Sequence, residues 1–247
     1  MTNHKVASRE EWLEARKALL IHEKEETRLR DRNAAERLAL PWVKIDKTYG
    51  FDTPSGRKTL AELFDGRSQL VVYHFMLPPE WDAGCSGCSF LADHLDGPLP
   101  HLNHHDVTLV AVSRAPLEKI AAYKTRMGWK FPWASSFGDD FNYDFGVSFT
   151  PEMTVVGATY NFEPVEGDNP GELPGMSSFY KDETGQVFHT YSSYGRGGED
   201  LIGTYMILDR APLGRNESGD MGDWMRRHDE YENAAPAKAC HAEAVPA

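Results

Sequence analysis

The amino-acid sequence predicts an α/β protein with a mixed central sheet, on three observations. Residues 69–76 and 106–112 are near-continuous apolar runs, as expected for parallel strands buried on both faces. Each run is followed by a segment of helical periodicity, and two strand–helix units in series imply parallel pairing with right-handed crossovers. Residues 177–180 and 186–191 alternate around a short turn, which predicts an antiparallel hairpin.

A long helix is predicted over residues 8–38. Ser8 and Glu11 have the spacing of a capping box, and the segment contains neither Pro nor Gly. From Glu23 onward it is too polar for a core helix, so it would coat a domain or pack against a second subunit. We therefore expect a helical extension over residues 1–40, and homo-oligomerisation through it is a hypothesis.

The rest of the chain is expected to form the main domain, over residues 41–231. A period-2 pattern with a turn at residues 53–56 indicates a β-hairpin near its start. Shorter helical segments are predicted over residues 60–64, 89–102 (interrupted at Gly97-Pro98), 115–127, 198–208 and 223–231.

Two further segments stand out by composition. Residues 129–170 are irregular and rich in aromatic side chains, and we interpret them as an insertion that supplies the walls of a pocket. Residues 232–247 are rich in Ala and Pro without hydrophobic periodicity, which predicts a disordered tail. Cys240 lies in this tail and is expected to have no function; the alternative is that a flexible thiol there resolves an oxidised Cys85.

Composition and charge exclude several classes of protein. The 247 residues include 26 Lys and Arg against 38 Asp and Glu, a formal net charge of −12 that disfavours nucleic-acid binding. No apolar run approaches the roughly 20 residues of a membrane helix, and the charged first twenty residues do not have the pattern of a signal peptide. Three cysteines suit a reducing compartment, so a cytoplasmic location is expected.

The chemistry is concentrated in the motif C-S-G-C, residues 85–88. At the first turn of a helix, free amides and the helix dipole stabilise a thiolate on the first cysteine, and the second cysteine lies one turn later on the same face. Cys85 is therefore the predicted nucleophile and Cys88 the resolving thiol of a reversible two-electron exchange. This hypothesis needs no cofactor beyond the redox-active disulfide. Its partners would be a thiol or disulfide substrate and a cellular reductant.

Two alternatives remain open. In the first, the protein is a non-catalytic binder: Cys85 and Cys88 with His94 and His101 hold a soft metal ion such as Zn²⁺ or Cu(I), or the aromatic pocket holds a ligand such as haem. In the second, the fold is a scaffold and the cysteines are idle.

Six segments of the chain are distinctive when taken together: residues 81–90, 106–116, 127–133, 140–146, 188–191 and 203–205. With them the sequence resembles a bacterial thioredoxin-like family, the domain-of-unknown-function family numbered 899. The resemblance extends over roughly residues 8–231 and implies a thioredoxin-like three-layer sandwich.

Two departures from the wider thioredoxin superfamily concern the dithiol. Gly84 stands before Cys85 where thioredoxins have Trp, and Met176 stands at the expected position of their cis-proline, with Pro174 two residues earlier. The resemblance also allows a peroxiredoxin-like peroxidase, but Asp82 occupies the place of the threonine that precedes the peroxidatic cysteine, and a carboxylate there would disfavour a thiolate. The residues expected to shape the substrate pocket are His74, Trp81, Gly84, Ser86, Gly87, Met176 and Ser177.

Overall fold

The computed structural model describes residues 4–165, 171–218 and 222–231, and these divide into a helical unit before Trp42 and a larger α/β unit from Trp42 onward. The predicted disordered tail and Cys240 lie outside the described residues. Among the described helices, none is both long enough and apolar enough to cross a membrane.

The first unit is the helix α1 (Arg9–Leu38), which confirms the predicted capping box. The Ser8 hydroxyl accepts a hydrogen bond from the Glu11 backbone N–H at 3.2 Å, and the Glu11 carboxylate accepts one from the Ser8 N–H at 2.9 Å. No residue of α1 is buried, and the helix carries surface ion pairs such as Arg16 with Glu23. Oligomerisation through α1 stays a prediction.

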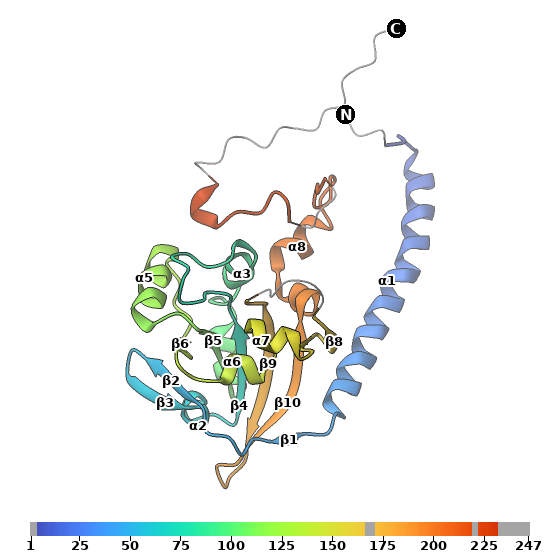
Figure 1. Ribbon diagram of the computed structural model, residues 1–247. Coiled ribbons are helices and arrows are strands. Elements are labelled where there is room, and N and C mark those ends of the chain that lie inside the picture. Colours follow the sequence, from blue (N-terminus) through green and yellow to red (C-terminus); the bar gives the residue numbers. More distant parts are fainter. Residues whose placement is uncertain (1–3, 166–170, 219–221, 232–247) are drawn as a thin grey trace. The chain divides into compact units, whose positions relative to one another are not determined.

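The second unit is built on a mixed sheet (Figure 1), in which the described residues form eight strands in the order β1-β10-β9-β4-β5-β6-β2-β3. Strands β4, β5 and β6 are parallel, and β9 and β10 form the predicted antiparallel hairpin beside β4. The strands are β1 (Val43–Lys44), β2 (Gly50–Thr53), β3 (Gly56–Thr59), β4 (Gln69–His74), β5 (Val107–Ser113), β6 (Trp133–Ser135), β9 (Gly175–Lys181) and β10 (Val187–Tyr194). A separate small pair comprises β7 (Thr159–Tyr160) and β8 (Glu163–Pro164).

Three helices follow strands of this sheet at the positions that define a thioredoxin fold. Helix α3 (Ser86–Ala92) connects β4 to β5, α5 (Leu117–Met127) follows β5, and α8 (Gly203–Leu208) follows β10. The central order β5-β4-β9-β10, with β4 and β5 parallel and β9 and β10 antiparallel to their neighbours, is the thioredoxin arrangement. The predicted fold class is therefore confirmed.

Two hydrophobic cores, one on each face of the sheet, complete the three layers. Along β4 the side chains alternate, so that Tyr73 packs with α3, α5 and α8 while Val72 packs against the opposite face. The second core receives α2 (Leu60–Leu63) and α6 (Phe141–Asp144). Further short helices are α4 (Leu99–His104) and α7 (Pro151–Val155), with 3₁₀ segments η1 (Gly195–Leu201) and η2 (His228–Glu230).

The structure corrects two sequence-based expectations about elements. Residues 133–135 are strand β6 of the main sheet and not part of an irregular insertion. The sequence did not predict this strand, because three residues are too few for a period-2 pattern to be recognised. The predicted helix over 198–208 divides into η1 and α8, and the one predicted over 223–231 reduces to η2 within an irregular segment. That segment is held by side-chain hydrogen bonds from Arg126 and Arg227, which a periodicity argument does not detect.

Candidate functional site

Cys85 lies at the start of α3, directly after the loop of residues 75–84 that connects β4 to this helix. It is the N-cap residue of α3, with the non-helical dihedral angles φ −52° and ψ 137°, and its N–H donates to the Met76 carbonyl at 3.1 Å. The Ser89 hydroxyl donates to the Cys85 carbonyl at 2.7 Å. An N-cap side chain faces the free N–H groups of the first helical turn, so the Cys85 sulfur occupies a position that favours negative charge.

This environment lowers the pKa of Cys85 to about 6, with hydrogen bonding from the Cys88 thiol as the largest cause. The backbone N–H groups of Cys88 and Gly87 and the positive charge of Arg227 act in the same direction, while burial acts against them. At neutral pH the half-buried Cys85 is therefore mainly a thiolate, the nucleophilic form of cysteine.

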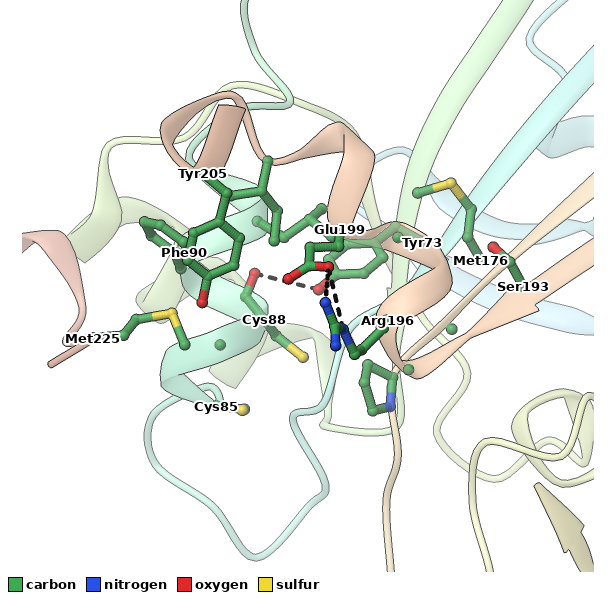
Figure 2. A pocket seen from close by; sticks show the side chains of 17 residues that line it. Tyr73, Cys85, Cys88, Phe90, Met176, Ser193, Arg196, Glu199, Tyr205 and Met225 are labelled. Atoms are coloured by element: carbon green, nitrogen blue, oxygen red, sulfur yellow. Dashed lines mark hydrogen bonds and ion pairs between the residues drawn. The ribbon is translucent and has the colours of Figure 1, made fainter. Parts of the chain in front are cut away.

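Cys88 has the opposite character. Its side chain is 3% exposed, and burial raises the pKa of its thiol well above the ordinary value, a direction reinforced by the adjacent Cys85. The Met76 N–H approaches the Cys88 sulfur at 3.5 Å, and the Tyr73 hydroxyl donates to the Cys88 carbonyl at 3.4 Å (Figure 2). Both cysteines are free thiols, one ionised and reachable, the other protonated and buried.

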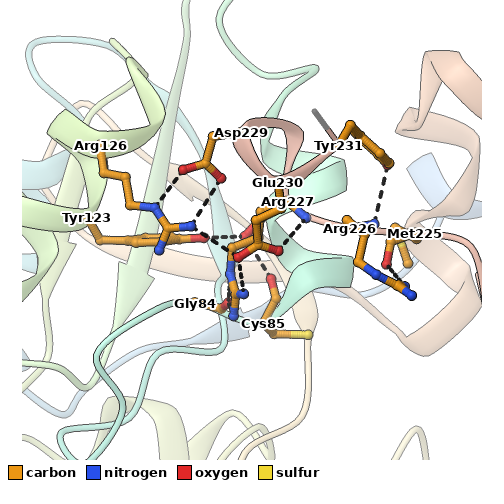
Figure 3. Close-up of polar contacts among 11 residues, drawn as sticks. Gly84, Cys85, Tyr123, Arg126, Met225, Arg226, Arg227, Asp229, Glu230 and Tyr231 are labelled. Carbon is orange, nitrogen blue, oxygen red and sulfur yellow. Dashed lines mark hydrogen bonds and ion pairs between the residues drawn. The ribbon is translucent and has the colours of Figure 1, made fainter. Parts of the chain in front are cut away.

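Arg227, which the sequence analysis did not identify, contacts Gly84, the residue before Cys85. Its Nε and Nη2 donate to the Gly84 carbonyl at 2.9 and 2.7 Å, and its Nη1 donates to Glu230 at 2.9 Å (Figure 3). Arg126 binds Asp229 and Glu230 from α5 and so anchors the same segment. The segment carrying Arg227 is thereby fixed beside Cys85.

Position 84 requires glycine because neighbouring core side chains leave no room for a Cβ atom. A Cβ added there would lie 2.4 Å from Cε1 of Phe75 and 2.8 Å from Cε1 of Tyr123, two rings of the core beneath the motif. Because the rings cannot withdraw, a larger residue such as the tryptophan of thioredoxins does not fit.

Gly84→Ala is therefore expected to lower the free energy of unfolding by about 1–3 kcal/mol, the usual cost of overpacking a core. Urea denaturation measures it. Gly97→Ala is the matched control, since an added Cβ there meets nothing within 4 Å, and its expected effect is within about 0.5 kcal/mol. Equal stabilities of the two variants would contradict the packing argument.

A cavity of about 260 Å³ opens beside both cysteines (Figure 2). Its walls come from β4, α3, the start of β9, the end of β10, η1, α8 and the segment carrying Met225. Met176, at the position expected for the cis-proline of thioredoxins, lines the cavity together with Pro174 and Gly87.

The aromatic segment does not supply these walls, contrary to expectation. The residues that line the cavity include none from positions 129–165. Five aromatic side chains of this segment belong instead to the two cores, where they are at most 8% exposed: Trp129, Phe131, Trp133, Phe141 and Phe145. Phe149 is also buried.

Other residues expected in the pocket lie elsewhere. His74 and Ser177 face the opposite side of the sheet, joined by a hydrogen bond of 2.8 Å between Nε2 and Oγ, because the alternation of β4 turns His74 away from Tyr73. Burial lowers the pKa of His74 to about 3, so it stays neutral. Trp81 is 38% exposed on the loop before the motif, and Ser86 is the first residue of α3; neither lines the cavity.

Asp82 does not act on the thiolate in the way expected. Its side chain is 95% exposed and pairs with Lys119 at 3.1 Å, and its charge is not among the causes that set the pKa of Cys85.

The alternative metal ligands are not brought together. Across the described parts of the chain, no group of three or more His, Cys, Asp and Glu side chains is arranged to hold a metal ion. Both ring nitrogens of His94 are engaged, Nδ1 with the Phe90 carbonyl at 2.8 Å and Nε2 with the Thr204 hydroxyl at 2.9 Å. His101 lies on α4, which Pro98 separates from the helix that carries Cys88.

Fold and site together define a thioredoxin-like protein whose two cysteines begin the helix that follows the central strand β4. The model of the family described as "Bacterial protein of unknown function (DUF899)" matches residues 1–231, and the chain belongs to this family. The comparison with curated proteins found no match.

Solved structures similar to this chain include peroxiredoxins. Peroxidoxin BcpB from Mycobacterium tuberculosis is 14% identical, with a TM-score of 0.42 over 68% of this chain and 96% of its own. A variant of peroxiredoxin Q from Xanthomonas campestris is 13% identical, with a TM-score of 0.39 over 64% and 90%. The yeast mitochondrial 1-Cys peroxiredoxin is 16% identical, with a TM-score of 0.39 over 69% and 78%. The assignment of the fold rests on the strand order described above.

Proposed function

We propose that the protein is a thiol–disulfide oxidoreductase in which Cys85 attacks and Cys88 resolves. The observation that carries the proposal is the contrast between two neighbouring thiols. The pKa of the half-buried Cys85 is lowered to about 6, whereas that of the fully covered Cys88 is raised. Thiol–disulfide exchange requires one accessible thiolate and a second thiol that stays protonated until the mixed disulfide has formed, and the two cysteines have these properties.

The reaction proceeds in two exchanges. The Cys85 thiolate attacks one sulfur of a substrate disulfide; a bond forms between Cys85 and that sulfur, the substrate S–S bond breaks, and the other half leaves as a thiolate. Cys88 then attacks the Cys85 sulfur, forming the Cys85–Cys88 disulfide and releasing the second half, while the Cys88 proton passes to a released thiolate. The substrate gains two electrons and the protein loses two.

A thiol reductant of the cell is needed to regenerate the dithiol by the reverse exchanges. The covering of Cys88 fits its role, because a protonated resolving thiol does not compete for substrate in the first step. Once Cys85 is in a mixed disulfide its negative charge is gone, and the coupling that raises the pKa of Cys88 is relieved.

The proposal predicts a reversible disulfide between Cys85 and Cys88. The full-length protein is equilibrated in buffers of varied reduced-to-oxidised glutathione ratio, then acid-quenched, alkylated and analysed by peptide mass spectrometry. We expect a single two-electron transition with the cross-link confined to residues 85 and 88. Failure of this cross-link to form at any ratio would overturn the proposed function.

A further inference from the structure

The cavity beside the dithiol is apolar and its charges are internally paired. The aromatic rings of Phe90 and Tyr205 meet edge to face at 5.1 Å in its wall. Among its lining residues Arg196 and Glu199 carry charge, and Nη2 of Arg196 donates to the Glu199 carboxylate at 2.9 Å (Figure 2). Glu199 also accepts from Nη1 of Arg215 at 2.6 Å. A ligand in the cavity thus meets carbon surface and an already neutralised carboxylate.

The cavity is also small and shares its wall with the nucleophile. Its volume of about 260 Å³ lies just below the usual range for drug-sized ligands, roughly 300–1,000 Å³. Met225 closes the side next to the motif: a Cβ placed on Gly87 would lie 3.6 Å from Cε of Met225 and 3.8 Å from the Cys85 sulfur. A substrate substituent that fills the cavity therefore places the sulfur that carries it next to the Cys85 sulfur.

From this geometry we infer the substrate class: compact disulfides with an uncharged apolar substituent, which occupies the cavity while Cys85 attacks the attached sulfur. This inference rests on the proposed function. The disulfide of a folded protein is surrounded by a broad polar surface. Cys85 is half-buried beside the segment fixed by Arg227, so such a surface fits poorly against it. The charged halves of glutathione disulfide find no unpaired countercharge among the lining residues.

The chemistry is the exchange already described, with the apolar half R of a disulfide R–S–S–R in the cavity. The Cys85 sulfur forms an S–S bond to one sulfur of the substrate, giving the mixed disulfide Cys85–S–S–R, as the substrate S–S bond breaks and the first R–S⁻ leaves. Attack by Cys88 on the Cys85 sulfur then expels the second R–S⁻ from the cavity. An external thiol reductant restores the dithiol. Each disulfide reduced yields two R–S⁻ groups, one protonated by the Cys88 proton and the other by solvent.

A homologous series of disulfides tests the inference. Full-length reduced protein is mixed with diethyl, di-n-propyl or di-n-butyl disulfide, or with glutathione disulfide, and second-order loss of the Cys85 thiol is followed by rapid quench and mass spectrometry. These dialkyl disulfides differ little in intrinsic reactivity, so differences between their rate constants report the burial of their alkyl chains in the cavity. We expect a gain of up to about fourfold for each added methylene, and slower reaction with glutathione disulfide. A flat series, or glutathione disulfide as the fastest, would overturn the inference.

Two variants and a small reagent separate the possible failures. Met225→Trp reduces the space beside Gly87 and is expected to flatten the chain-length dependence, whereas Met153→Trp on α7, outside the cavity lining, is expected to leave it unchanged. Methyl methanethiosulfonate, which needs no cavity, reports the intrinsic reactivity of Cys85. Normal reaction with this reagent and Cys85–Cys88 closure, but no chain-length dependence, refutes the substrate class alone. Loss of closure refutes the proposed function.

Discussion

Cys85→Ser is expected to abolish thiol–disulfide exchange, whereas Cys88→Ser is expected to preserve the first step and stop at the second. A serine hydroxyl at position 85 cannot form the mixed disulfide, so turnover should fall to the uncatalysed rate. Without the resolving thiol, Cys85 should accumulate as a mixed disulfide in one-to-one stoichiometry, because nothing inside the site displaces the bound half. Intact-mass spectrometry after mixing with one equivalent of disulfide detects the mixed disulfide of Cys88→Ser, and thiol release from excess disulfide in the presence of a thiol reductant measures turnover.

Cys240→Ser is the matched control, and its turnover should equal that of the unchanged protein. Turnover retained by Cys85→Ser would remove the nucleophile from this account. Normal turnover in Cys88→Ser, lost only when Cys240 is also replaced, would transfer the resolving role to the C-terminal thiol.

Arg227→Gln is expected to raise the pKa of Cys85 and slow its reaction below neutral pH. The variant removes a positive charge that favours the thiolate and loosens the two-nitrogen contact with the Gly84 carbonyl. With a pKa of about 6, half of Cys85 is ionised at pH 6, and any rise in the pKa lowers that fraction and the rate of reaction with it. The measurement is the pH profile of alkylation by iodoacetamide, whose midpoint should move upward.

Arg226→Gln provides the control, since Arg226 is exposed and its Nη1 donates to the nearby carbonyls of Asp223 and Met225. Its profile should superimpose on that of the unchanged protein. Arg227→Lys keeps the charge but not the two-nitrogen geometry, so it should fall between the two. Identical midpoints for all three variants would show that Arg227 does not act on Cys85.

The sequence analysis was most successful where local pattern carries the information. The apolar runs and the hairpin pattern anticipated β4, β5, β9 and β10, and the spacing of Ser8 and Glu11 anticipated the start of α1. These features depend on residues close together in the chain, so periodicity and capping rules apply directly.

The rest of the site depends on contacts between distant segments. Arg227 reaches Gly84 across 143 positions of sequence from a segment without regular structure, and only the tertiary fold reveals that contact. The aromatic residues near position 131 were assigned to a pocket because composition does not distinguish a pocket wall from a core. The placement of His74 shows the same limit: alternation decides its face, and a continuous apolar strand conceals which face the motif uses.

The central claim is that Cys85 is an activated thiolate paired with a buried thiol. Titration of the Cys85 thiol tests it most directly. Ultraviolet thiolate absorbance of the reduced, metal-free, full-length protein is followed against pH, with Cys85→Ser as the blank. The account predicts a single low transition near pH 6 that disappears in the blank. A transition at the ordinary cysteine value of about 8.5, unchanged by Arg227→Gln, would contradict it.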